Sequence, residues 1–251
     1  MENEKPRILT SLLVPVILLT LMWGFKVFEL VSGLPLTGLG IYPQTLKGLP
    51  GILFSPLVHA DFSHLSANSV SAFVLTAMLF YFYREIALQV FLLLWLLTGL
   101  WVWAGAREAY HIGASGLVYG LAAFLFLSGL IRRDTRLAAL ALFVVFSYGS
   151  LVWGIFPQFF PEKNISWESH LMGLVAGVVL ALYYKRQGPR TPRYSWELEE
   201  EHDETPDITE HPEKPYWMQD STPGSGSVEI RYHMTHEKDK PAADDTPSEG
   251  K

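Results

Sequence analysis

Two short motifs in the sequence pair residue types that form a nucleophile and its base. Ser115 lies between Gly113 and Gly116 at the start of an apolar run, and His170 lies at the start of a later one. A serine hydroxyl is a weak nucleophile unless a neighbouring base accepts its proton, and histidine is the commonest such base. The two motifs therefore predict a serine nucleophile activated by His170.

Each motif also has a purely structural interpretation. A lone Gly-x-Ser-Gly sequence more often caps a helix or permits close helix packing, and His170 could be an interfacial histidine. An ionisable side chain within an apolar span is costly, however, unless it has a partner or a function. The glycines leave the Ser115 hydroxyl and nearby N–H groups uncovered, and a helix N-terminus favours developing negative charge.

Glycine spacing predicts that the two apolar runs pack together. Glycines one and two turns after His170 form a small-residue face, and glycines after Ser115 repeat the spacing. If these faces meet, Ser115 and His170 lie side by side at the starts of the two apolar runs. Asp61, the nearest carboxylate expected on the outer side of the membrane, is predicted to cap a turn. No carboxylate is then placed to orient the histidine, so a dyad is predicted and not a triad. The glycines are Gly173, Gly177, Gly116 and Gly120.

A third cluster precedes these motifs in the chain. His64 and Asn68 are four residues apart and therefore share one helix face. They could donate hydrogen bonds to one acceptor, or they could be an interfacial capping cluster. Metal binding is a further alternative, because His59 and His111 are expected on the same side of the membrane as His64 and His170. Since no spacing resembles a zinc site, we expect no metal and a supporting role for His59.

Long apolar runs dominate the chain up to Gln187. Hydrophobic residues make up 49% of the 251 residues, and the runs are long enough to cross a bilayer. Residues 1–187 are therefore expected to form an all-α polytopic membrane domain with six spans. The predicted spans are 8–30, 64–83, 86–105, 115–131, 137–156 and 170–184.

The composition changes sharply after Gln187. Residues 188–251 contain half of the prolines and 16 of the 25 acidic residues, which predicts an acidic, disordered cytoplasmic tail. The formal net charge of −6 arises from this tail, and no basic patch indicates nucleic-acid binding. The absence of cysteine excludes disulfides and thiolate sites.

The distribution of basic residues predicts the orientation of the spans. Because cytoplasmic loops carry the excess of Lys and Arg, both termini are expected in the cytoplasm. The second, fourth and sixth spans then begin on the outer side, which places His64, Ser115 and His170 at one depth. The cytoplasmic set is Lys5, Arg7, Arg84, Arg132, Arg133, Arg136, Lys185, Arg186, Arg190 and Arg193, and the outer set is Lys26, Lys47, Arg107 and Lys163.

The three motifs, in this order, resemble those of the rhomboid intramembrane serine proteases. The resemblance covers about residues 58–184 and implies a six-helix rhomboid fold with Ser115 and His170 as the catalytic dyad. It implies that His64, Asn68 and the Ser115 N–H hold the oxyanion. It also implies that Tyr119, which shares a helix face with Ser115, packs on the His170 imidazole, although on the sequence alone Tyr119 could equally be a core aromatic.

The resemblance further implies the partners and location of the protein. The expected substrates are transmembrane proteins in the lipid bilayer, cleaved near the outer boundary without a cofactor. The expected location is a bacterial inner membrane. A rhomboid-like pseudoprotease that holds membrane clients, and a small transporter, remain as alternatives. Loss of the serine or histidine would indicate the first, whereas internal repeats or broken helices would indicate the second; neither feature is evident.

Overall fold

The computed structural model describes residues 4–132, 134–156 and 166–189. The chain divides into two compact units, Met1–Arg193 and Tyr194–Lys251. The second unit lies outside the described residues, as does almost all of the predicted tail at 188–251. The domain boundary at residue 187 and the disorder of the tail therefore stay predictions.

Helices account for most of the described part of the first unit. The long ones are α1 (Glu4–Ser32), α3 (Phe62–Phe82), α4 (Ala87–Gly105), α5 (Ser115–Arg132), α6 (Thr135–Tyr148) and α7 (Trp167–Tyr183). The short ones are η1 (Leu36–Leu39), η2 (Leu46–Gly48), α2 (Gly51–Phe54), η3 (Ser55–Leu57) and η4 (Gly149–Ile155). Within the described ranges the extended pairing is an isolated antiparallel bridge between Ile41 and His111.

The lengths and composition of the helices confirm the predicted all-α polytopic membrane class. Helices α1, α3, α4 and α5 are long and apolar enough to cross a membrane, and α6 and α7 are shorter apolar helices. Pro15 lies inside α1 without ending it, as is tolerated in membrane helices.

The fifth predicted span differs from the observed helix, and the structure gives the start of the sixth. The fifth span is predicted over 137–156, but α6 ends at Tyr148 and the 3₁₀ helix η4 follows it to Ile155. Gly149 follows directly, and glycine weakens a continuing α-helix. The sixth span is predicted from His170, but that length is short for a bilayer and suggests either local thinning or a start nearer Trp167; α7 begins at Trp167. His170 therefore lies within the first turn of its helix.

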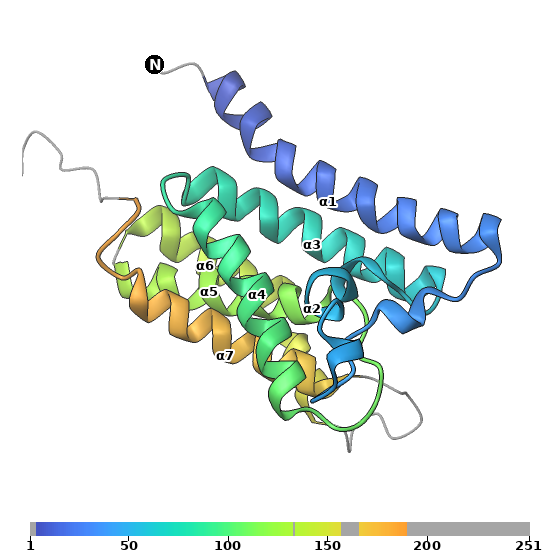
Figure 1. The fold of residues 1–251 in the computed structure, drawn as a ribbon. Coiled ribbons are helices and arrows are strands. Elements are labelled where there is room, and N and C mark those ends of the chain that lie inside the picture. Colours follow the sequence, from blue (N-terminus) through green and yellow to red (C-terminus); the bar gives the residue numbers. More distant parts are fainter. Residues whose placement is uncertain (1–3, 133, 157–165, 190–251) are drawn as a thin grey trace, which may run out of the picture. The chain divides into compact units, whose positions relative to one another are not determined.

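Helix α5 is the centre of the bundle. It packs against α7, α6, α3 and α4, while α1 packs mainly on α3 (Figure 1). Leu121, Phe124 and Leu125 of α5 are fully buried. A central helix with neighbours on several sides holds its N-terminal residue, Ser115, in a fixed place relative to the other helices.

The predicted glycine faces do pack together. A Cβ atom on Gly173 would overlap the Gly116 carbonyl oxygen, and one on Gly177 would overlap that of Gly120. The backbones of α5 and α7 therefore approach too closely for any side chain at these positions. This close approach brings the first turns of the two helices together.

We expect Gly173→Ala to separate α5 from α7 and to lower the free energy of unfolding by about 1–3 kcal/mol, as overpacking does. Thermal unfolding in detergent measures the effect. The matched control is Gly24→Ala in α1, where a Cβ would have no heavy atom within 4 Å. Equal melting temperatures for the two variants would mean that the glycine contact does not set the spacing of α5 and α7.

Candidate active site

The first turns of α5 and α7 place Ser115 beside His170. The Ser115 Oγ lies 2.9 Å from the His170 Nε2, which is a hydrogen-bond distance. His170 is only 8% exposed. The two residues that the sequence pairs across 55 positions are therefore in direct contact.

A main-chain carbonyl fixes the protonation pattern of the histidine. The His170 Nδ1 lies 2.9 Å from the carbonyl oxygen of Gly154 in η4. Because a carbonyl can only accept, the neutral ring carries its hydrogen on Nδ1, and its Nε2 has a lone pair for the Ser115 hydroxyl. This is the tautomer that a general base requires.

The sequence did not identify Gly154 as a partner of His170. Main-chain carbonyls leave no signature in side-chain identity, and the predicted fifth span continued through this residue. In a regular α-helix the carbonyl would bond to an N–H four residues on. Gly154 instead belongs to a 3₁₀ helix that ends at Ile155, and its carbonyl oxygen accepts from the His170 imidazole.

Tyr119 stacks on the His170 imidazole. Its ring lies parallel to the His170 imidazole, with 4.2 Å between centroids and 6° between planes. A Cβ atom on Gly154 would overlap the Tyr119 hydroxyl and come within 3.2 Å of the His170 Nδ1. The absence of a side chain at Gly154 thus makes room for both rings, and the Tyr119 contact agrees with the placement that the sequence resemblance implied.

The backbone just before Ser115 is held by the segment that precedes α3. Gly113 has a φ of 104°, which favours glycine, and its N–H donates to the Ser55 carbonyl at 2.8 Å. The Ala114 N–H donates to the His59 Nε2 at 3.3 Å. Tyr119, Gly113, Gly116 and His59 are the residues predicted to support the site. Of these, Gly113 belongs to the loop that carries the serine, and His59 contacts it.

His64 and Asn68 face this loop from α3. A Cβ on Gly113 would lie 2.8 Å from the His64 ring and 3.7 Å from the Asn68 Nδ2. Asp61 caps α3 by accepting from the His64 N–H at 2.8 Å, as expected. Asn68 is 7% exposed, and its Nδ2 has no hydrogen-bond partner among the described residues. A buried donor without an acceptor costs about 1–3 kcal/mol, so its retention suggests a ligand oxygen.

Burial of His59 favours the neutral form of its ring near pH 7. His59 lies between η3 and α3, outside the spanning helices, and burial lowers its pKa to about 4. The neighbouring His64 and Lys26 lower the pKa further, against a smaller opposite effect of the Leu57 carbonyl and Asp61. A neutral ring keeps Nε2 as an acceptor, which the contact with the Ala114 N–H requires.

A second polar chain, which the sequence did not reveal, joins the serine loop to α7. The His111 Nε2–H donates to the Arg107 carbonyl at 3.0 Å, so its Nδ1 accepts from the Ser166 hydroxyl at 2.6 Å. Ser166 in turn accepts from the Ser169 hydroxyl at 2.6 Å. His111 is thus engaged in main-chain and serine contacts, and the described residues contain no group of three His, Cys, Asp or Glu side chains suited to a metal ion.

Comparisons with known proteins identify the family of the chain. A family model described as the Rhomboid domain matches residues 47–187. An uncharacterized protein of Mycobacterium tuberculosis is 33% identical over 185 residues, covering 71% of this chain and 77% of the relative. An uncharacterized protein of Mycobacterium leprae is 32% identical over 190 residues, covering 72% and 75%. A protein of Acanthamoeba polyphaga mimivirus with the word rhomboid in its name is 27% identical over 137 residues, covering 53% and 73%.

Proposed function

Since the chain belongs to the rhomboid family, we propose that it is an intramembrane serine endopeptidase that cleaves transmembrane helices near the outer membrane boundary. The observation that carries the proposal is the 2.9 Å contact between the Ser115 Oγ and an imidazole nitrogen that the Gly154 carbonyl leaves free to accept. A serine used only for capping or packing needs no such base.

The first half of the reaction makes an acyl-enzyme. Ser115 Oγ attacks the scissile carbonyl carbon while His170 Nε2 takes the hydroxyl proton, and a tetrahedral oxyanion forms. The C–N bond then breaks as the imidazolium returns that proton to the leaving amine. In the second half, water attacks the acyl group with His170 again as the base, and Ser115 leaves with its proton.

The proposed imidazolium is stabilised without a carboxylate. The Gly154 carbonyl accepts from Nδ1–H in both protonation states, and the face of Tyr119 covers the ring. A cation over an aromatic face gains about 0.5–2 kcal/mol. These two contacts orient the ring, which is the function of the aspartate in a triad.

The oxyanion is assigned to three donors. They are the Ser115 main-chain N–H, His64 and Asn68. Support comes from the positions of His64 and Asn68 beside Gly113 and from the unpaired Asn68 Nδ2. The N-terminus of α5 adds a favourable electrostatic field for the developing charge. Gly113 and Gly116 keep this region free of side chains.

The proposed topology places both ends of the chain on one side of the membrane. Residues 1–187 form the membrane domain and residues 188–251 a cytoplasmic tail, with both termini in the cytoplasm of a bacterial inner membrane. The partners are transmembrane substrates and lipid, and the chemistry requires neither a cofactor nor a metal. The support is the excess of basic residues on the side of the N-terminus.

Cleavage by purified protein in lipid vesicles tests the function. A single-span model substrate should be cut by the wild type, whereas Ser115→Ala and His170→Ala should lower the rate by at least about 10³-fold, as in other serine proteases. Circular dichroism controls for folding. If the folded wild type retains the substrate but never cuts it, the protein is a client-holding pseudoprotease and the proposed activity is wrong.

Removing the Asn68 amide tests the oxyanion assignment. Asn68→Ala should lower kcat by about 10²–10³-fold with little change in KM, because the donor acts on charge that develops in the transition state. Gln89→Ala is the control, since it removes an exposed side-chain amide whose oxygen accepts from the Tyr184 hydroxyl instead. A lowered melting temperature with wild-type kcat would show that Asn68 only supports the fold.

A further inference from the structure

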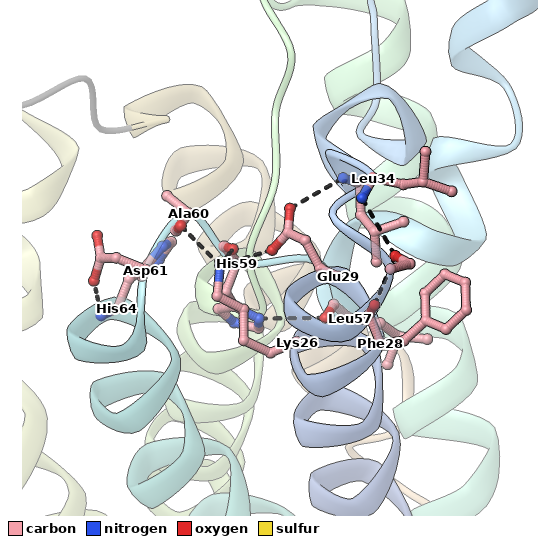
Figure 2. Close-up of polar contacts among 11 residues, drawn as sticks. Lys26, Phe28, Glu29, Leu34, Leu57, His59, Ala60, Asp61 and His64 are labelled. Carbon is pink, nitrogen blue, oxygen red and sulfur yellow. Dashed lines mark hydrogen bonds and ion pairs between the residues drawn. The ribbon is translucent and has the colours of Figure 1, made fainter.

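A cluster on α1 reaches the site from outside the region that matches the Rhomboid domain. Lys26 Nζ donates to the Glu29 Oε2 at 2.7 Å, to the His59 carbonyl at 3.1 Å and to the Ala60 carbonyl at 2.9 Å. The Glu29 Oε1 accepts from the Leu36 N–H at 3.0 Å. Figure 2 shows Lys26 and Glu29 on α1, directed towards the segment that runs from Leu57 to His64.

The cluster is specific in its geometry. An ammonium group has three N–H donors, and each has an acceptor on a different residue. The side chains of Lys26 and Glu29 are only 12% and 19% exposed. Partly buried ion pairs add little net stability, because removing the charges from water offsets their attraction. Fixing the position of the two carbonyls is a better explanation of this pair than stability alone.

The carbonyls that Lys26 fixes belong to the residues that hold the serine loop. The His59 main chain contacts Lys26, while the His59 ring accepts from the Ala114 N–H. Ala114 directly precedes Ser115. Further along the same segment, the His64 ring lies against Gly113 and edge-to-face with the His59 ring at 5.1 Å between centroids. A continuous chain of contacts therefore runs from α1 to the nucleophile.

We propose that Lys26, held by Glu29, is a positioning residue for the active site. By fixing the His59 and Ala60 carbonyls, Lys26 keeps the His59 ring against the Ala114 N–H, and this contact sets the place of the Ser115 backbone beside His64. The C-terminal part of α1 thus helps to position the active site. The effect on turnover rests on the proposed protease function, whereas the effect on the loop does not.

The test compares Lys26→Met with Arg7→Met. Methionine has a similar length without the charge or the donors. Arg7 is the matched control because it is also a cation on α1 that donates to a main-chain carbonyl. Its acceptor is the Tyr81 carbonyl of α3 at 3.2 Å, and Arg7 lies at the other end of α1. Two quantities are measured on folded protein: hydrogen exchange of the Gly113 and Ala114 amides, and kcat and KM on the single-span substrate.

For Lys26→Met we expect exchange of the Ala114 amide to quicken by about tenfold, because an anchor of its acceptor, His59, is lost. The Gly113 amide, which donates to the Ser55 carbonyl, should change less. We expect kcat to fall about 10–100-fold, as for a misplaced catalytic group, with KM nearly unchanged. Arg7→Met should match the wild type in both quantities. Glu29→Gln removes the ion pair but keeps a polar side chain of nearly the same size, and it should shift the exchange rate and kcat in the same direction. It decides the question if Lys26→Met does not fold.

Wild-type exchange and kcat in folded Lys26→Met would overturn the proposal, even with a lower melting temperature, because that result describes a purely structural ion pair. Equal changes in Lys26→Met and Arg7→Met would overturn it too, since the effect would then be general to α1. If the wild type cleaves nothing, the protease function fails while the exchange measurement still decides the role of Lys26.

Discussion

The hydrogen bond from the His170 Nδ1 to the Gly154 carbonyl is the interaction on which the proposed chemistry depends. Without it, the neutral imidazole could carry its hydrogen on Nε2 and would offer Ser115 a donor where an acceptor is needed. Inside a membrane domain a carbonyl dipole has an advantage over a carboxylate, because it orients the ring without a second buried charge. In the proposed mechanism, one main-chain carbonyl thereby takes the place of a third catalytic side chain.

The rest of the first unit maintains this geometry from several directions. Glycine-to-glycine packing brings α7 against α5, and the central position of α5 fixes the serine. The segment before α3 holds the loop that leads to Ser115 through the Ser55 carbonyl and the His59 ring. On the far side of that segment, Lys26 fixes the His59 carbonyl. Each contact is modest alone, and together they leave Ser115 little freedom to move away from His170.

The sequence predicted the parts of the site that side chains define. Repeated small residues at helical spacing indicated the α5–α7 contact, and the heads of the apolar runs indicated Ser115 and His170. It did not predict the Gly154 carbonyl or the end of α6 at Tyr148, because both depend on the path of the main chain. Nor did it predict the function proposed for Lys26, which was considered only as a charge at a span end, since its acceptors are carbonyls 33 and 34 residues away.

Active-site labelling with a fluorophosphonate measures the central claim most directly, because only a serine with a working base displaces the fluoride at neutral pH. Intact folded protein in detergent is treated with the probe, and the modified peptide is located by mass spectrometry. The account predicts one adduct on Ser115 that is absent from both Ser115→Ala and His170→Ala. An unlabelled wild type that is correctly folded, or a label that persists equally in Ser115→Ala, would contradict it.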